Sequence, residues 1–288
     1  MTEIRRIGSS IDALGEGPIW CPEAQALYWV DIRAPCIHRW EQASGSTTSW
    51  TMPDAIGSFA LASDGRILAA LRDRISLFDP ATGGFELVAM LRQDGDGIRS
   101  NDGKCDRQGR FWMGSMDESQ RAQRGSLYRL AGRDLTAVLG GLDVPNSLCF
   151  APDGRTMYFT DTPSKTIWAF PYDPASGELG ARRVFVQTDA SESPDGATVD
   201  AEGYLWSARY HGGRVVRHAP DGSVDRVVEV AARQVTCCAF GGPDLTTLFI
   251  TTATQNLSPE QLAAQPAAGH LLALEVGVKG LAERRFVV

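Results

Sequence analysis

The stretches GEGPIWCPEAQALYWVD (15–31) and PNSLCFAPDGRTMYFTD (145–161) can be superposed residue for residue, although 130 positions separate their first residues (145 − 15). The superposition aligns Trp20 with Phe150, Tyr28 with Tyr158 and Asp31 with Asp161. Each stretch ends in a short run of aromatic and branched apolar residues, which is typical of a β-strand. The chain is therefore expected to contain an internal repeat built from strands.

The same pattern recurs along the whole chain. Strand-like runs occur at 26–32, 65–71, 109–115, 155–161, 203–209 and 246–252, and each is followed by a second strand-like run. One residue at or just before the start of each main run serves as an anchor for the alignment. The anchors are Ala24, Gly65, Gly109, Gly154, Gly203 and Asp244. A period of roughly 40–50 residues with several strands per unit is typical of a propeller blade. We therefore predict an all-β fold, a six-bladed β-propeller that occupies residues 1–288 as a single domain.

Composition excludes several classes of function. With 28 Lys and Arg against 35 Asp and Glu, the formal net charge is −7, which argues against a partner such as nucleic acid. No apolar run approaches the roughly 20 residues of a membrane helix, and no apolar segment follows the N-terminal charges as in a secretory signal. The six cysteines form no C-x-x-C pair and are interpreted as reduced thiols. We expect a cytoplasmic protein without a membrane partner.

Two segments at the end of the chain carry further predictions. LSPEQLAAQP (257–266) has Ser258 and Pro259 at its start and is predicted to be a short surface helix. The final run RRFVV (284–288) is expected to pair with the N-terminal EIRRI (3–7) and so close the ring.

One set of positions breaks the equivalence of the repeats. The residues eight before the anchors are Glu16, Gly57, Asn101, Asn146, Asp195 and Thr236, and we expect them in loops that converge on the propeller axis. Four of them carry carboxylate or amide oxygens, the ligands that hard divalent cations prefer. Asn, Asp and Gly are also common turn formers, so a purely structural role for each residue is the alternative.

Other catalytic patterns are absent from the sequence. There is no G-x-S-x-G elbow, and the four His show no metal-binding spacing. His211 follows the main run of the fifth repeat and is a candidate for the mouth of the ring, with a structural role as the alternative.

Five motifs together carry a resemblance to a known family. LGEGPIW (14–20), IRSNDGKCDRQGRFWMGSM (98–116), VPNSLCFAPDGRTMYFTDT (144–162), SPDGATVDAEGYLW (193–206) and FGGPDLTTLFITTA (240–253) resemble the SMP-30/gluconolactonase family, which includes regucalcin-type proteins and bacterial sugar lactonases. The resemblance covers nearly the whole chain. It implies a six-bladed propeller with one divalent metal on its central axis.

Site residues follow from the resemblance, position by position. It implies metal ligands at Glu16, Asn146 and Asp195, and substrate contacts at Arg99 and Asn101. Some members of the family contact the sugar with a further Glu. The aligned position in this chain is Ser119, so Glu118, one residue earlier, becomes the third candidate for substrate binding. The cofactor is one divalent ion, with calcium, zinc, manganese, magnesium and iron all left open.

The activity implied is metal-dependent hydrolysis of a small-molecule sugar lactone to its aldonic acid. Asp195 is the candidate general base, with a metal-bound hydroxide as the competing assignment. A non-catalytic calcium-binding or regulatory propeller and a paraoxonase-like aryl esterase are the alternatives. Pentonolactones, hexonolactones, uronate-derived lactones and sulfo-sugar lactones all remain open as substrates.

Overall fold

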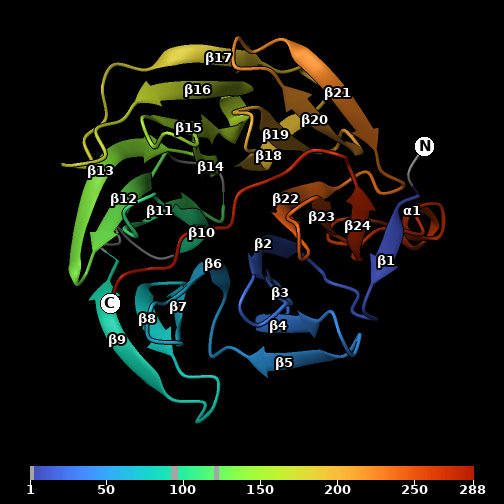
Figure 1. Ribbon diagram of the computed structural model, residues 1–288, viewed down its shortest axis with the longest axis horizontal. Helices are drawn as coiled ribbons and strands as arrows, with labels where there is room; N and C mark the ends of the chain where they lie inside the picture. The colour runs from blue at the N-terminus through green and yellow to red at the C-terminus, as the bar shows by residue number, and fades with distance from the viewer. Residues whose placement is uncertain (1–2, 92–96, 120–122) are drawn as a thin grey trace.

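The repeats fold into blades of four antiparallel strands. The computed structural model describes residues 3–91, 97–119 and 123–288, and 24 strands of these residues form six sheets of four. Each inner strand packs against the inner strand of the next blade, and the sixth packs against the first (Figure 1). The predicted six-bladed all-β propeller is confirmed.

Each blade extends from an inner strand beside the axis to an outer strand at the rim. In that order, the first blade contains β2 (Gly15–Cys21), β3 (Ala26–Asp31), β4 (Cys36–Glu41) and β5 (Thr47–Thr51). The second contains β6 (Ile56–Leu61), β7 (Ile67–Leu71), β8 (Arg74–Phe78) and β9 (Phe85–Met90). The third contains β10 (Ile98–Cys105), β11 (Phe111–Asp117), β12 (Gly125–Ala131) and β13 (Asp134–Leu142).

The other three blades follow the same plan. The fourth contains β14 (Pro145–Phe150), β15 (Thr156–Asp161), β16 (Thr166–Pro171) and β17 (Arg183–Gln187). The fifth contains β18 (Ser193–Val199), β19 (Leu205–Tyr210), β20 (Arg214–His218) and β21 (Val224–Glu229). The sixth contains β22 (Val235–Gly241), β23 (Thr247–Thr252), β24 (Leu271–Glu275) and β1 (Arg5–Ile7).

The anchor positions mark a turn that needs a left-handed backbone. In four blades the anchor between the inner and second strands has a φ between +66° and +90°, at Gly65, Gly109, Gly154 and Gly203. Glycine adopts this conformation without a steric penalty. In the two blades without glycine, the residue after the anchor is left-handed instead, Gln25 with φ 46° and Leu245 with φ 59°. The sequence repeat therefore reflects a left-handed turn that recurs between the first and second strands of each blade.

The ring closes through the N-terminal strand, but with a different partner from the one predicted. β1 pairs with β24, so that Arg5 faces Ala273 and Ile7 faces Leu271. The run 284–288 does not pair with 3–7, and the predicted pairing is wrong. Ile7 instead packs in one buried cluster with side chains of the first and sixth blades, among them Trp20, Trp29, Phe249 and Leu271.

The chain ends in a segment that we call the C-terminal strap, residues 277–288. Figure 1 shows it running across the middle of the ring, in front of the inner strands. Its backbone bonds to turns of several blades: the Gly280 amide donates to the Leu245 carbonyl at 2.7 Å, and the Phe286 amide donates to the Leu61 carbonyl at 2.9 Å. Glu283 forms an ion pair with Lys104 of the inner strand β10 at 3.0 Å. The strap therefore covers one end of the propeller axis.

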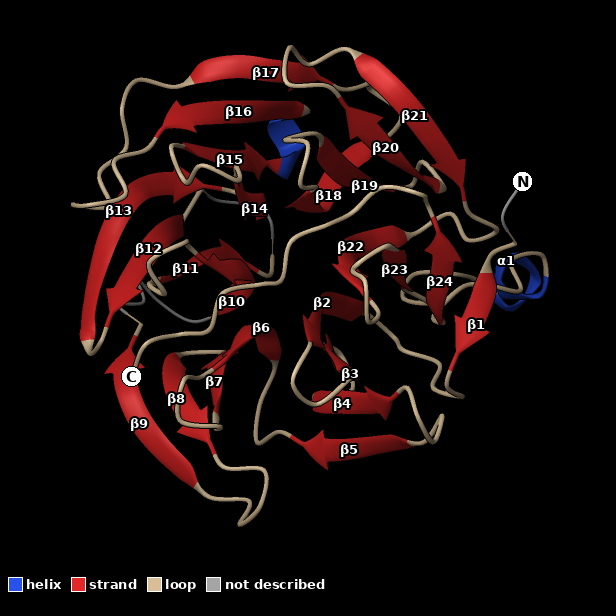
Figure 2. Ribbon diagram, in the orientation of Figure 1, coloured by secondary structure: helices blue, strands red, loops and turns tan. Residues whose placement is uncertain are grey.

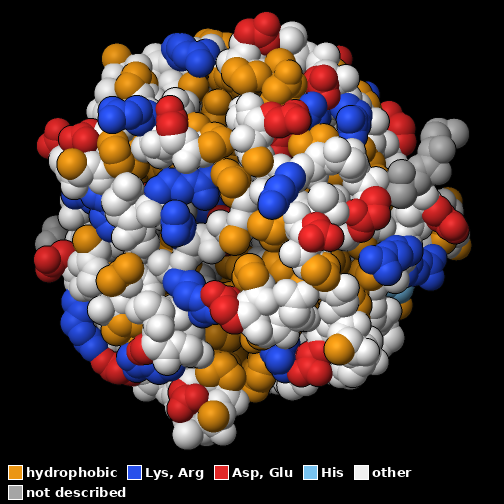
Figure 3. Space-filling view, in the orientation of Figure 1, with side chains coloured by type: hydrophobic (Ala, Val, Ile, Leu, Met, Phe, Trp, Pro, Cys, Tyr) orange, Lys and Arg blue, Asp and Glu red, His pale blue; other side chains and the backbone are white. Residues whose placement is uncertain are grey.

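The remaining elements are short. The predicted helix is confirmed but is limited to α1 (Pro259–Ala263), where Ser258 and Gln261 form a reciprocal cap, and Figure 2 shows it at the outer edge beside β1. A 3-10 turn, η1 (Thr162–Ser164), connects β15 to β16. All six cysteines are free thiols, and among the described residues no helix is long and apolar enough to cross a membrane. On the strap face, basic and acidic side chains are interspersed (Figure 3).

Truncating Ile7 should weaken the closure of the ring. Ile7 is 4% exposed, so Ile7→Ala leaves a cavity between the first and last blades and should lower the free energy of unfolding by about 2–4 kcal/mol. Ile11, which is 64% exposed, provides the matched control, and Ile11→Ala should change it by less than about 0.5 kcal/mol. Urea unfolding followed by tryptophan fluorescence measures both. Equal midpoints for the two variants would contradict this account of closure.

Candidate active site

The six ring positions lie on the inner strands, near the end of the axis opposite the strap. Glu16, Asn146 and Asp195 lie on β2, β14 and β18, and Asn101 lies on β10. In each of these strands the pairing register with the second strand shifts at or beside the ring residue, as in a β-bulge. The expectation that these residues lie in loops is therefore wrong. They were misread because bulged strands contain the Gly, Asn and Asp that also mark turns.

Left-handed residues set the direction of two of these side chains. Gly17, which follows Glu16, has a φ of 55°, and Ser147, which follows Asn146, has a φ of 58°. This conformation is uncommon for a serine, and the surrounding structure holds it. The Ser147 hydroxyl is fully buried and donates to the Asp195 carbonyl. The bulge at Asn146 and Ser147 thus links β14 to β18 through the hydrogen bond from the Ser147 hydroxyl.

Carboxyl groups accumulate at the floor of the site. Glu16 and Asp195 are 9% and 8% exposed. Burial, reinforced by the charge of Asp102, raises the pKa of Glu16 to about 8. Burial and the charges of Glu16 and Asp102 raise the pKa of Asp195 well above its ordinary value. Burial also raises the pKa of Asp102. Buried like charges are destabilising unless a cation or protons neutralise them.

A chain of hydrogen bonds orients the amides beside these carboxyls. Asn101 Nδ2 donates to the Pro145 carbonyl at 2.9 Å and to Asn146 Oδ1 at 3.1 Å. Asn146 Nδ2 donates to the Thr162 hydroxyl at 2.9 Å. This pattern fixes the Asn146 amide, and its Oδ1 keeps a second lone pair for another partner.

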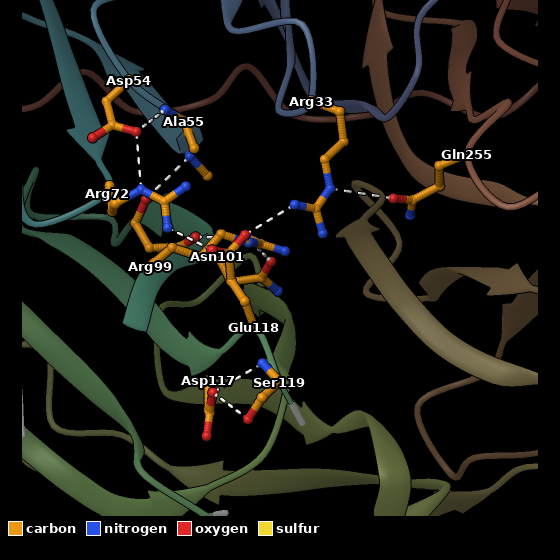
Figure 4. A network of polar contacts seen from close by, with 12 residues as sticks. Arg33, Asp54, Ala55, Arg72, Arg99, Asn101, Asp117, Glu118, Ser119 and Gln255 are labelled. Atoms are coloured by element: carbon orange, nitrogen blue, oxygen red, sulfur yellow. Dashed lines mark hydrogen bonds and ion pairs between the residues drawn. The ribbon is translucent and has the colours of Figure 1, made fainter. Parts of the chain in front are cut away.

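An arginine cluster forms one wall of the site (Figure 4). Arg99 is 4% exposed, and its Nη1 donates to Asn101 Oδ1 at 2.8 Å. Its Nε has no hydrogen-bond partner and lies 3.5 Å from Glu118 Oε1. Glu118 also pairs with Arg33 at 2.9 Å and with Arg72 at 2.5 Å. Burial acts to raise the Glu118 pKa, but the arginines lower it below the ordinary value.

These groups surround one cavity of about 530 Å³, a size typical of small-molecule sites. Glu16, Arg99, Asn101, Asn146 and Asp195 all line it, so the structure brings these predicted site residues together. His211 also lines the cavity, as predicted. Glu118 is not among the lining residues and reaches the site through Arg99 and Arg33. A cavity of about 610 Å³ at the strap end is lined by neither Glu16 nor Asp195.

The donor set fits a hard divalent cation. Glu16 and Asp195 supply carboxylate oxygens, Asn146 supplies an amide oxygen, and calcium and magnesium prefer such ligands. Their raised pKa values are an electrostatic strain that a cation would relieve. Among the described residues, no group of three or more His, Cys, Asp and Glu side chains is placed to hold a metal ion, and the proposed set includes an amide oxygen.

Sequence reasoning missed several further residues at the site, four of them in loops that follow second strands. Arg33, Thr162, Lys165 and Gln255 line the cavity from the loops that follow the second strands of the first, fourth and sixth blades. A partial signal existed, because these loops lie at the same end of the blades as the ring residues.

Comparisons with known proteins show the family of the chain. Residues 14–254 match the SMP-30/Gluconolactonase/LRE-like region. A 6-deoxy-6-sulfogluconolactonase of Pseudomonas putida is 37% identical over 95% of this chain and 94% of its own length. An L-arabinolactonase of Azospirillum brasilense is 37% identical over 96% and 92%.

The fold comparison gives the same result. A crystal structure described as a calcium-binding protein, regucalcin, from Agrobacterium tumefaciens superposes with a TM-score of 0.96 at 35% identity. The match covers 100% of this chain and 98% of that one. The blade repeat, the matched region and the relatives together show that this chain belongs to the SMP-30/gluconolactonase family.

Proposed function

We propose that this protein hydrolyses sugar lactones with the help of one divalent metal ion held by Glu16, Asn146 and Asp195. The observation that carries the proposal is the pair of buried carboxyls, Glu16 and Asp195, on the floor of an open polar cavity. The names of the relatives in Pseudomonas putida and Azospirillum brasilense describe sugar lactonases, which supports this class of substrate.

When bound, the metal supplies Lewis acidity that polarises the lactone carbonyl. The residues of the chain do the rest. Arg99 donates to substrate hydroxyls through its guanidinium, and Asn101 Oδ1, which accepts from Arg99, has a second lone pair for a substrate hydroxyl. A carboxylate oxygen of Asp195 accepts a proton from the attacking water. The water oxygen bonds to the acyl carbon, the ring C–O bond breaks, and the released ring oxygen takes up a proton to give the hydroxy acid.

The alternatives fit the cavity less well. A purely regulatory calcium site needs a closed coordination shell, whereas only three protein ligands are proposed and the site opens into a cavity of about 530 Å³. An aryl ester would use the apolar lining residues, such as Leu14, Ile32 and Met116, but has no hydroxyls for the polar residues Arg33, Arg99, Asn101 and Gln255 to bind.

Removing either acidic charge should abolish turnover without unfolding the protein. Asp195→Asn and Glu16→Gln should lower kcat/KM for lactones at least about 100-fold, because each removes a proposed ligand and Asp195 the proposed base. Both should keep or raise the melting temperature of the metal-free protein, since each removes a carboxyl whose raised pKa costs folding free energy at neutral pH. Asp244→Asn, at an exposed turn, is the matched control. Acid release from a lactone panel, followed by pH indicator with defined metals, tests this. Full activity in either variant after chelation and metal addition would refute the assignment.

Metal affinity should rise with pH up to about 8. Because the pKa of Glu16 rises from 4.5 to about 8 on folding, the metal-free native state holds a proton that the unfolded chain loses between these values. The stability of the metal-free protein should therefore fall as pH rises through this window. Binding must displace the proton, so calorimetry at pH 6 in two buffers of different ionisation enthalpy should show about one or more protons released per ion. Affinity independent of pH between 5 and 8 would contradict this.

Arg99 should affect binding more than turnover. The pKa of Arg99 is lowered to about 10 by burial, so its side chain stays charged at neutral pH. Arg99→Ala should raise KM about 10- to 100-fold with a smaller loss of kcat, and Arg99→Lys should recover part of the effect. Steady-state kinetics measures the split. A KM unchanged in Arg99→Ala would remove Arg99 from the site.

A further inference from the structure

Among the described residues that line the cavity, Lys165 is the one lysine, and its backbone is held in place at the mouth. It follows η1 and has a left-handed φ of 54°. Its amide donates to the Thr162 carbonyl at 3.1 Å, and its carbonyl accepts from the Thr188 amide at 2.8 Å and from Gln187 Nε2 at 3.0 Å. The Thr188 hydroxyl also donates to the Lys165 carbonyl, at 3.0 Å. The backbone of this left-handed lysine is therefore positioned in advance of any ligand.

The ammonium group of Lys165 touches only neutral acceptors. Its Nζ donates to the Ser193 hydroxyl at 2.7 Å and to the Glu192 carbonyl at 3.0 Å. The Glu192 carboxylate is already taken by Arg209 and Arg214. Among the described residues, no carboxylate forms an ion pair with Lys165, whereas Arg33 and Arg99 share Glu118.

The charges that line the cavity leave this cation in excess. Arg33, Arg99 and Lys165 carry three positive charges, and Glu16, Asp195 and the adjoining Glu118 carry three negative ones when ionised. A divalent cation on Glu16 and Asp195 would then make the cavity positive by two. Arg33, Arg72 and Arg99 share the one carboxylate of Glu118, so both walls keep positive charge. Lys165 is the cation whose contacts are neutral oxygens.

The neighbours of Lys165 suit an anion as well. His211 lines the same cavity, and burial, together with the charges of Arg233 and Lys165, lowers its pKa. An imidazole at this position can donate a hydrogen bond to a ligand in the cavity. Thr162, in the turn before Lys165, contacts Asn146 at 2.9 Å and connects this wall to the floor of the site.

We propose that Lys165 forms an anion subsite and that the preferred substrates are sugar lactones with an acidic exocyclic group, a phosphate, sulfonate or carboxylate. The inference rests on the proposed lactonase function and names its substrate class. Arg99 and Asn101 hold hydroxyls from the third blade, while Lys165 holds the acidic group from the fourth.

The test compares charged and neutral lactones. Wild-type protein should hydrolyse 6-phospho-D-glucono-1,5-lactone and 6-deoxy-6-sulfo-D-glucono-1,5-lactone with kcat/KM at least about 10-fold above that for D-glucono-1,5-lactone. D-Glucaro-1,4-lactone provides the carboxylate arm. Lys165→Met should lower kcat/KM on the preferred charged lactone about 10- to 100-fold, mainly through KM, and change the neutral lactone less than about 3-fold. Lys165→Arg should recover most of the loss.

Lys279→Met is the matched control, because Lys279 is exposed on the strap. It should leave the preference for charged lactones unchanged. Raising the salt concentration from about 20 to 200 mM should reduce the wild-type preference and leave Lys165→Met unaffected. Equal losses on neutral and charged lactones in Lys165→Met, or a wild-type preference for the neutral lactone, would overturn the proposal.

A binding measurement separates this inference from the lactonase function. The ring analogue 1,5-anhydro-D-glucitol and its 6-phosphate have no acyl bond to hydrolyse, and calorimetry gives the Kd of each for the metal-loaded protein. Tighter binding of the phosphate that is lost in Lys165→Met supports the subsite, even if no lactone is turned over. Equal Kd values for the two analogues overturn the subsite, even if lactones are hydrolysed.

Discussion

Closure of the ring is the constraint on which the rest of the structure depends. Only a complete circle of six inner strands directs their first residues to one axis, and β1 completes the last sheet by pairing with β24. Closure brings Glu16 and Asp195 together although 179 positions separate them (195 − 16). Because the blades repeat, the same inner position of each blade reaches the hub, and changing the residue there changes the chemistry without disturbing the scaffold.

The electrostatics of the site follow from that convergence. Inner strands are buried on both sides, so acidic residues at the hub lose their hydration, and their pKa values rise. The positively charged side chains lie at the walls of the site, away from these carboxyls. Arg33, Arg72 and Arg99 form ion pairs with Glu118, and Lys165 donates hydrogen bonds to neutral oxygens. The proposed divalent ion at the hub would neutralise these carboxylates, and an anionic group near Lys165 would balance the positive charge that then remains.

Local signals made the blades and the hub positions predictable from the sequence. The glycine anchors form left-handed turns, and the aromatic runs after them are typical of strands. The spacing of these two signals therefore revealed the length of the blade repeat. The inner strands were mistaken for loops because their bulges contain the residues that form turns. The position of 284–288 and the contacts of Glu118 and Lys165 depend on segments distant in sequence, and no local pattern encodes such contacts. Helix α1 has only five residues, Pro259–Ala263, and is therefore shorter than the predicted segment 257–266.

The C-terminal strap affects the side of the propeller from which small molecules can reach the site. It covers the far end of the axis, and the space around Lys104 and Glu283 there is only about 10 Å³, smaller than a sugar. Among the described residues, the cavity lined by Glu16 and Asp195 therefore lies at the end of the axis away from the strap. If the proposed hydrolysis takes place there, the product would leave on the side from which the next substrate arrives, so release would precede the next binding event.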